Sequence, residues 1–402
     1  MSAKRRTELS SERYKMRKCS CACVFGSCVL AALLTSPLLI LENPAHAAPA
    51  TPPQDSTSLQ AAIDALVRAP EGPAGVIVVI DNGSSTRVQT AGVASTGTKP
   101  PPTADGHLRV ASLTKAMTAA VALRLVEEGT LRLGDTVGDW LPELPAAWHD
   151  VSLLQLLNHT SGVPDFAKNP AVAKAISESP TVAPTPSEIL AYAGNTTDFP
   201  AGARYEYSNS NPFITGLIIQ AATGKQYEDV LRAEVLEPLG MKDTYLPAFN
   251  DPKVPAPVTR GYQVDDGQRE DVTELVAFGG WGWSSGGVVS TPADLTKFVR
   301  GYVGGELFGE TIQETQHDSM QPGNSDPEGP GRNSAGAGLF TYQTRCGMVY
   351  GHTGSVLGYT LFMAATGDGE RSVAFAVTTQ ISDNMVSQLR VAQELAVCAA
   401  LE

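Results

Sequence analysis

Hydrophobic residues near the beginning of the chain predict one helix followed by two strands. Apolar positions of residues 59–67 recur on one helical stripe, whereas residues 75–80 form a short β-branched run. That run ends at the turn signal Asp81-Asn82-Gly83, and a second strand pattern covers residues 86–91. We therefore expect a helix packed on a sheet that opens with a β-hairpin.

The middle of the chain has a helical pattern instead. Residues 111–128 form a long run rich in Ala, Leu and Val that stops at Gly129, a residue suited to the left-handed cap position. Helical character continues over residues 151–157, 186–192, 212–222 and 227–236. Residues 251–257 form a Pro-rich connection that ends this part.

Strand patterns return over residues 337–342, 348–350, 360–365 and 371–379, and residues 385–400 form a last amphipathic helix. This order predicts an α/β (α+β) fold: an antiparallel sheet flanked by the N- and C-terminal helices, plus an inserted mostly helical lobe. We expect the α/β lobe over 58–110 and 265–402 and the helical lobe over 111–264. The groove between the lobes is the expected place for a site.

The first 47 residues have the order of a secretory signal peptide. A basic stretch from Lys4 to Lys18 precedes an apolar run, which is followed by Ala45-His46-Ala47. The run is long enough for a retained membrane span, but Pro37 and the A-x-A sequence favour cleavage after Ala47. Residues 48–57, rich in Pro, Ala and Thr, are the expected flexible lead-in. We expect a secreted protein without a membrane span after cleavage.

A lipid anchor on Cys28 is a weaker alternative to cleavage. Phe25 stands where lipoprotein signals favour a small or aliphatic residue.

Cleavage would change both the charge and the cysteine content. It removes seven Lys or Arg and three Asp or Glu, so the formal net charge moves from -13 to -17, which argues against a nucleic-acid partner. Of the six cysteines only Cys346 and Cys398 would remain, in an oxidising compartment. We predict that they form a disulfide. Spacing alone does not exclude two free buried thiols.

Three short motifs carry candidate chemistry. Ser112-Leu113-Thr114-Lys115 opens the long predicted helix, where residues three apart share one face. Tyr207-Ser208-Asn209 precedes another helix, and His352-Thr353-Gly354-Ser355 follows a short strand. Each has an ordinary alternative: an exposed Ser and Lys, a helix-capping turn, and a structural His with a glycine bulge.

The order and wide spacing of these motifs resemble the serine β-lactamase and penicillin-binding protein superfamily, with its S-x-x-K, Y-x-N or S-x-N, and K-T-G motifs. With a tyrosine in its second motif, the chain resembles the branch that contains class C β-lactamases (peptidase family S12). This branch also includes certain esterases, D-aminopeptidases and secreted D-alanyl-D-alanine carboxypeptidases. His352 stands where class C β-lactamases have Lys, as in the carboxypeptidase exported by streptomycetes.

Three further features resemble this branch. Residues 156–164 look like its L-L-x-H-T-S-G-[LV]-P segment, residues 237–241 look like its P-L-G-M segment, and Cys346 with Cys398 looks like the disulfide of the streptomycete carboxypeptidase. His159 lies in the first of these segments. Because that segment is structural in the family, we leave His159 outside the catalytic set.

The resemblance implies acyl transfer through Ser112. Either Lys115, if neutral, or Tyr207, if ionised, would activate the hydroxyl, and the sequence leaves both open. Asn209 would orient Lys115 and the substrate amide. The backbone N–H groups of Ser112 and Ser355 would form the oxyanion hole.

The resemblance also implies a substrate. His352 and Thr353 would face the terminal carboxylate of a D-Ala-D-Ala peptide or of a β-lactam. The charge on His352 would then matter for binding, and we expect its imidazole to titrate near pH 6.5. Arg345 is a candidate to assist, and Gly354 completes the motif. Trp281, within Gly280-Trp281-Gly282-Trp283, is expected either to wall the site or to lie in the core.

The leading functional hypothesis is an exported D-alanyl-D-alanine carboxypeptidase that acts on cell-wall peptides and is acylated by β-lactams. A β-lactamase or an esterase with the same residues is the nearest alternative, and a non-catalytic penicillin- or cell-wall-binding module is another. The intact set of Ser112, Lys115, Tyr207 and Asn209 argues against a pure binder. No metal-ligand spacing or phosphate-binding loop is visible, so no metal or cofactor is expected, and we expect a monomer.

Overall fold

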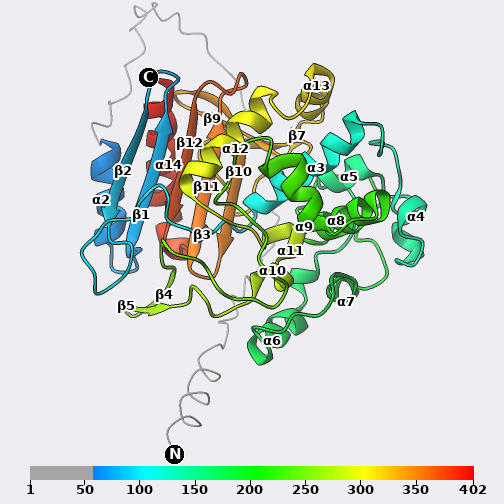
Figure 1. Cartoon of the computed structure of the whole chain (residues 1–402), viewed down its shortest axis with the longest axis horizontal. Coiled ribbons are helices and arrows are strands. Elements are labelled where there is room, and N and C mark those ends of the chain that lie inside the picture. Colours follow the sequence, from blue (N-terminus) through cyan, green and yellow to red (C-terminus); the bar gives the residue numbers. More distant parts are fainter. Residues whose placement is uncertain (1–57) are drawn as a thin grey trace, which may run out of the picture. The chain divides into compact units, whose positions relative to one another are not determined.

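An eight-stranded antiparallel sheet is the centre of the computed structural model, which describes residues 58–402 (Figure 1). The signal peptide and lead-in predicted for residues 1–57 lie outside the described residues. The order of strands is β2-β1-β12-β11-β10-β9-β8-β7. Their bounds are β1 Gly75–Asp81, β2 Thr86–Gly92, β7 Gln321–Pro322, β8 Arg332–Ala335, β9 Phe340–Thr344, β10 Gly347–Val356, β11 Tyr359–Ala365 and β12 Ser372–Val377.

The two ends of the described chain meet in this sheet. Strand β1 pairs with β2 to form the expected hairpin, and on its other side it pairs with β12, with Val76 opposite Val377. Both faces of these central strands are apolar. Ile77 and Val79 of β1 pack into one layer, whereas Val76, Val78 and Ile80 pack into the opposite layer. The predicted antiparallel sheet is confirmed, and it needs cover on both faces.

Helices from different parts of the chain supply that cover. The terminal helices α2 (Leu59–Arg68) and α14 (Val386–Leu401) pack together on one face, as predicted. The opposite face carries α12 (Pro292–Gly304), which the sequence patterns had not predicted (Figure 1). Its signals are local ones: Thr291 caps it by accepting from the Asp294 N–H, Pro292 occupies the first turn, and Gly305 ends it with a positive φ.

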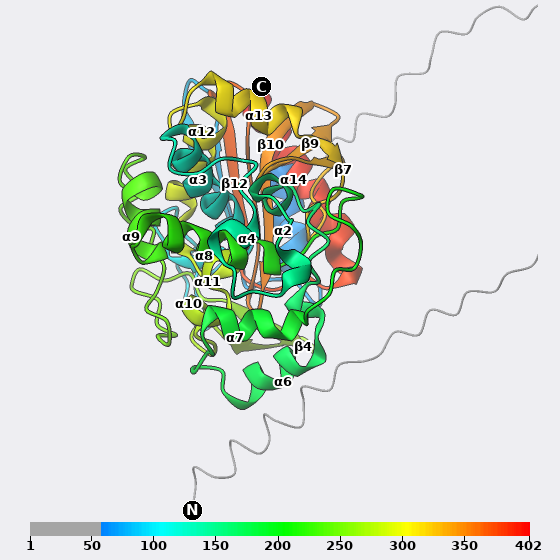
Figure 2. The ribbon, with the colours of Figure 1, turned by 90° about the vertical axis from the view of Figure 1, so that its right-hand side faces the viewer.

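Residues 113–236 are mostly helical and lie together on one side of the sheet, which faces the viewer in Figure 2. The long helix α3 packs against α8 and against β10. The helices are α3 Leu113–Glu127, α4 Val137–Trp140, η1 Ala146–Trp148, α5 Leu153–Leu157, η2 Phe166–Lys168, α6 Pro170–Glu178, α7 Pro186–Leu190, η3 Ala191–Ala193, α8 Ser210–Thr223, α9 Tyr227–Leu231 and η4 Arg232–Leu236.

The remaining elements lie between residues 108 and 385. They are β3 Leu108–Arg109 with β6 Val289–Ser290, β4 Tyr262–Asp265 with β5 Gln268–Asp271, α10 Phe278–Trp281, α11 Trp283–Gly286, α13 Glu310–Asp318 and η5 Asp383–Met385. Helix α11 falls in the range assigned to the sheet lobe, yet it packs against α3 and α8. Residues 58–402 cluster as one compact unit, and the boundary between two lobes stays a prediction.

Strand β10 is longer than its sequence pattern indicates. The pattern predicted a strand of residues 348–350, but the strand runs to Val356 and contains the whole His352-Thr353-Gly354-Ser355 motif. Strand β9 pairs only with residues 347–351, whereas β11 pairs with residues 350–356. Within the described part of the chain, the second half of β10 therefore has a strand on one side only. Its other edge borders the candidate site.

Candidate active site

Ser112 and Lys115 meet at the beginning of α3. Ser112 is the N-cap residue, and Ala111 before it adopts a positive φ of 52°, which is unusual for a residue with a Cβ. The side chain of Lys115 is buried. Its Nζ lies 2.9 Å from Ser112 Oγ and 2.8 Å from the backbone carbonyl oxygen of Ser285. The structure therefore brings together the first two predicted site residues in direct contact.

Burial changes the proton affinity of Lys115. Removal from water lowers its pKa to about 7, although the carboxylates of Asp165 and Asp326 oppose this shift. A Lys side chain with this pKa is substantially neutral at neutral pH. Its nitrogen then has a lone pair directed at a nearby hydroxyl.

Tyr207 has the opposite property. Its ring stacks on His159 with centroids 4.6 Å apart, and Lys115 Nζ lies 5.2 Å from its ring centroid. Burial raises the pKa of the phenol well above 10, and the nearby Ser112 hydroxyl offsets only part of this shift. Its Oη lies near that hydroxyl but makes no hydrogen bond of regular geometry with any described residue. The phenol therefore stays protonated, which favours Lys115 over Tyr207 as the base.

Asn209 is free to use its side chain because it caps α8 without a side-chain cap bond. Its amide nitrogen donates to Asp165 Oδ2 at 3.0 Å. We expected Asn209 to orient Lys115 and the substrate amide; in the structure its amide nitrogen contacts Asp165, a residue that sequence reasoning missed, and its role toward substrate stays a prediction. Asp165 lies immediately after the L-L-x-H-T-S-G-[LV]-P segment, so its place beside the resembling motif was the available signal.

The third motif presents its residues to opposite sides of β10. A Cβ added to Gly354 would lie 2.7 Å from the Val110 carbonyl oxygen and 2.8 Å from Leu113 Cδ1, so this position faces the beginning of α3. Thr353 instead donates its hydroxyl hydrogen to the Pro327 carbonyl at 2.5 Å. Ser355 lines the pocket that contains Ser112. The close approach of β10 to α3 requires glycine at 354.

His352 does not have the environment expected for a charged carboxylate ligand. Its side chain is 1 % exposed, its Nδ1 lies 2.6 Å from the Thr353 carbonyl oxygen, and its ring packs edge-on against Phe340. Burial lowers its pKa to about 3, and Lys115 contributes in the same direction. The expectation of an imidazole that titrates near pH 6.5 was wrong, because the ring is desolvated inside the protein.

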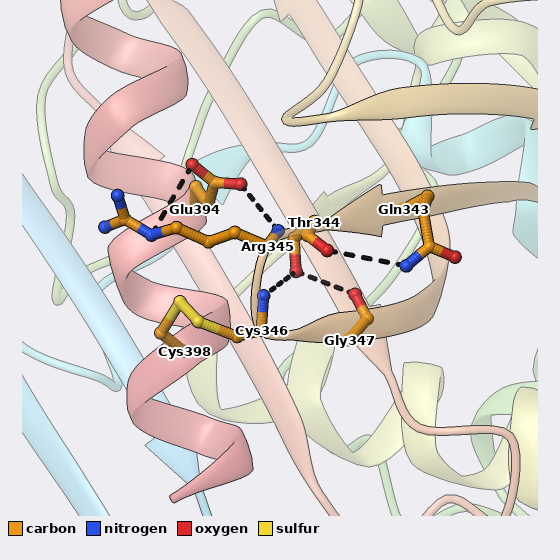
Figure 3. The surroundings of a disulfide bond; sticks show 7 residues. All are labelled: Gln343, Thr344, Arg345, Cys346, Gly347, Glu394 and Cys398. Carbon is orange, nitrogen blue, oxygen red and sulfur yellow. Dashed lines mark hydrogen bonds and ion pairs between the residues drawn. A yellow bond between two sulfur atoms is a disulfide. The ribbon is translucent and has the colours of Figure 1, made fainter. Parts of the chain in front are cut away.

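Arg345 does not belong to the site. It lies in the turn between β9 and β10, at the opposite end of β10 from Ser355. Glu394 of α14 accepts from its backbone N–H at 2.9 Å and lies 3.9 Å from its Nε (Figure 3). The expected assistance in carboxylate binding is therefore corrected: Arg345 ties the turn to the last helix.

The same turn holds the disulfide. Cys346 and Cys398 are bonded, with their Cα atoms 5.2 Å apart, and the bond joins the β9–β10 turn to α14 (Figure 3). The structure thus contains the predicted pair.

An open pocket with a volume of about 200 Å³ lies in front of Ser112. Its wall is mostly apolar: Phe166, Val172, Ile176, Phe278, Trp281 and Val356, with Asn209 and Ser355 as polar members. Trp281 satisfies both of its expected alternatives, since its ring lines the pocket while its side chain is buried and its Nε1 lies 3.3 Å from the Ser179 carbonyl. The pocket suits an amide substrate with an apolar side chain.

The match to known families agrees with this geometry. The sequence profile of the family described as Beta-lactamase matches residues 59–397. The chain belongs to the beta-lactamase family. Its relatives include a carboxypeptidase/endopeptidase and a D-aminopeptidase, so the chain is a serine hydrolase of the beta-lactamase and penicillin-binding protein group.

Two curated relatives illustrate the range of activities among proteins similar to this chain. The D-alanyl-D-alanine-carboxypeptidase/endopeptidase AmpH of Escherichia coli is 27% identical over 307 residues, which cover 74% of this chain and 72% of AmpH. The D-aminopeptidase of Brucella anthropi is 30% identical over 192 residues, or 47% of this chain and 35% of that protein.

Solved structures give the same fold. The D-amino acid amidase from Ochrobactrum anthropi SV3 matches with a TM-score of 0.72 and 28% identity, over 85% of this chain and 97% of that one. The D-stereospecific amidohydrolase from a Streptomyces species matches with a TM-score of 0.71 and 27% identity, over 80% and 94%.

Among residues 58–402, no helix is both long and apolar enough to span a bilayer. In the same range, no three His, Cys, Asp or Glu side chains are grouped in a way that would hold a metal ion.

Proposed function

We propose that the chain is an exported hydrolase that cleaves the amide bond after a D-amino acid through a Ser112 acyl-enzyme, with D-Ala-D-Ala peptides as its first substrate class. The contact of Lys115 Nζ with Ser112 Oγ at 2.9 Å carries this proposal. The carboxypeptidase name of AmpH, which matches along 74% of this chain, supports the substrate class. The signal-like sequence of residues 1–47 supports export.

The chemistry follows from the proton affinities. Neutral Lys115 takes the proton of Ser112 as Oγ bonds to the substrate carbonyl carbon and the carbonyl electron pair moves onto oxygen. Backbone N–H groups of Ser112 and Ser355 are the proposed donors to that oxygen. The Lys115 ammonium then gives the proton to the leaving nitrogen as the carbon–nitrogen bond breaks. Water later hydrolyses the ester and frees Ser112.

The free edge of β10 offers a way to hold the peptide. Residues 352–356 have no strand beside them on the pocket side in the described part of the chain. An extended peptide that pairs with such an edge gains backbone hydrogen bonds, while pockets read its side chains. This arrangement would place a peptide carbonyl beside Ser112, at the end of the same pocket.

A second substrate class is favoured by the lack of a cation for a carboxylate. His352 is buried with its pKa lowered to about 3, and Arg345 lies in a remote turn. Among the described residues that line the pocket, Lys115 is the only cationic side chain. An amide of an apolar D-amino acid needs no such partner. The D-amino acid amidase, similar over 85% of the chain, supports this alternative.

One experiment ranks the alternatives. The protein is incubated with a fluorescent penicillin, nitrocefin, a diacyl-Lys-D-Ala-D-Ala peptide, D-phenylalanine amide and a neutral ester, each beside its L-form where one exists. Faster turnover of the D-Ala-D-Ala peptide than of the amide supports the carboxypeptidase proposal. Faster turnover of the amide supports the second class. Turnover of none, with no penicillin adduct on Ser112, would contradict both.

A further inference from the structure

A small cavity lies beside Lys115, separate from the open pocket in front of Ser112. It has a volume of about 20 Å³, enough for one water molecule. Lys115 lines both spaces and so forms part of the wall between them. Its other lining residues come from α3, from α5 and the segment just after it, from α8, from the turn between β8 and β9, and from β9 and β10, and they include His159, His352 and Thr215.

The two histidines present complementary ring nitrogens. The Thr353 carbonyl oxygen only accepts, so His352 Nδ1 carries the hydrogen at 2.6 Å and Nε2 keeps a lone pair. In His159 the arrangement is reversed: Nδ1 accepts from the Ser208 backbone N–H at 3.2 Å, so Nε2 carries the hydrogen. Both rings stay neutral, because burial and Lys115 lower the pKa of each.

Thr215 completes the polar lining on the α8 side. Its hydroxyl donates to the Asn211 carbonyl one helical turn earlier, at 3.0 Å, and this leaves its oxygen lone pairs available. The lining thus contains one donor, His159 Nε2–H, and two acceptors, His352 Nε2 and Thr215 Oγ1. Lys115 is a further donor when it is protonated. A water molecule can make four hydrogen bonds of this kind.

We propose that the cavity holds one ordered water that accepts from His159, donates to His352 and Thr215, and accepts the third N–H of the Lys115 ammonium during acylation. The proposal rests on the proposed role of Lys115 as the base. The water solvates the ammonium that forms when Lys115 takes the Ser112 proton. His159, His352 and Thr215 are then positioning residues, since they act on Lys115 through the water.

The charged and titratable groups around Lys115 define what the test must separate. Tyr207 lies beside Lys115, and His159 and His352 line the same cavity. The carboxylates of Asp165 and Asp326 favour the protonated form of Lys115. The carboxylates remain in every variant below. Any change in the pKa of Lys115 in those variants therefore comes from the cavity side.

The direct test is a high-resolution crystal structure of the protein without substrate. We expect density for one water within hydrogen-bond distance of both Nε2 atoms. A dry cavity would overturn the proposal even in an enzyme that is fully active. Conversely, density for the water in a protein that none of the tested compounds acylates would uphold this site and contradict the proposed function. The two failures are therefore distinguishable.

The kinetic test uses matched pairs of variants. His352→Leu and Thr215→Val remove an acceptor, whereas His352→Gln and Thr215→Ser keep one. Without an acceptor the water is lost and the ammonium is less stable, so the acidic limb of kcat/KM moves to lower pH by about one unit and the plateau of kcat falls about tenfold. The conservative variants should recover most of both effects. A fall in kcat with no movement of the limb would show a merely structural role and overturn the proposal.

Discussion

Individual residues at this site are distinguished by burial more than by type. Lys115 and Tyr207 are both desolvated, yet desolvation favours the neutral form of each and therefore has opposite chemical consequences. It makes the Lys a base near neutral pH and keeps the phenol protonated. The sequence left these two candidates equal, because it does not give the solvent access of either side chain.

At this scale the first prediction concerns the nucleophile. Ser112→Ala removes the proposed nucleophilic oxygen and nothing larger, so folding should be unchanged while acylation by penicillin and hydrolysis of peptide or amide are lost. Intact-mass spectrometry after incubation with penicillin measures the adduct, and thermal unfolding provides the control. A penicillin adduct that persists on Ser112→Ala would refute the assignment.

The second prediction concerns the pH dependence that Lys115 sets. Its pKa of about 7 means that the base becomes protonated as the pH falls through 7. With a neutral ester substrate, kcat/KM should be level above that pH and fall about tenfold per unit below it. His352, with its pKa lowered to about 3, should add no step between pH 5 and 8. An acidic limb at pH 10 or above would instead indicate Tyr207 as the base, because burial raises the pKa of its phenol above 10.

At the scale of elements, the site depends on how closely β10 approaches α3. Ser112 is the N-cap residue of α3, whereas Ser355 belongs to the half of β10 that is paired only with β11. Gly354 lies between them and faces the backbone of the segment that leads into α3. The separation of these two elements therefore sets the geometry of the proposed oxyanion hole.

We expect Gly354→Ala to disturb this contact. Its Cβ would lie 2.7 Å from the Val110 carbonyl oxygen, so β10 or α3 must shift. Stability should fall by about 1 to 3 kcal/mol, and kcat/KM should fall about 10- to 100-fold because the reacting groups separate. Gly134→Ala, where nothing lies within 4 Å of the added Cβ, is the matched control and should behave like the parent. Equal kinetics in the two variants would contradict this role of Gly354.

For the whole molecule, the disulfide joins parts of the sheet layer that are far from the chemistry. Cys346 and Cys398 are 52 residues apart and link the β9–β10 turn to α14, the helix that packs on one face of the sheet. The turn lies at the opposite end of β10 from the site. The bond therefore constrains the fold without contacting the pocket.

Removal of this bond should destabilise the protein more than it affects its activity. In the Cys346→Ser/Cys398→Ser variant, the free energy of unfolding should fall by roughly 4 kcal/mol, the value expected for a closed loop of this length. At 25 °C kcat/KM should stay within about twofold of the parent. In the parent, thiol labelling under denaturing, non-reducing conditions should find no free cysteine in the mature chain. Two reactive thiols would exclude the bond.

Sequence patterns were sufficient for the elements whose signals are local. The stripe of residues 59–67, the hairpin around Asp81-Asn82-Gly83 and the run that ends at Gly129 each became the expected element. The three motifs identified Ser112, Lys115 and Tyr207, and the structure brings these residues together. Such features depend on residues close in sequence or on motif order, which a single chain displays directly.

Tertiary structure alone decided the features that depend on distant partners. Strand β10 extends to Val356 because β11 pairs with it, and Arg345 lies outside the site because the turn before β10 is directed toward α14. Burial lowers the pKa of His352 to about 3, and Asp165 accepts a hydrogen bond from the Asn209 amide, because of what the fold places around each side chain. Burial, pKa and strand pairing depend on residues that folding brings together from distant parts of the chain. They therefore cannot be predicted from sequence patterns alone.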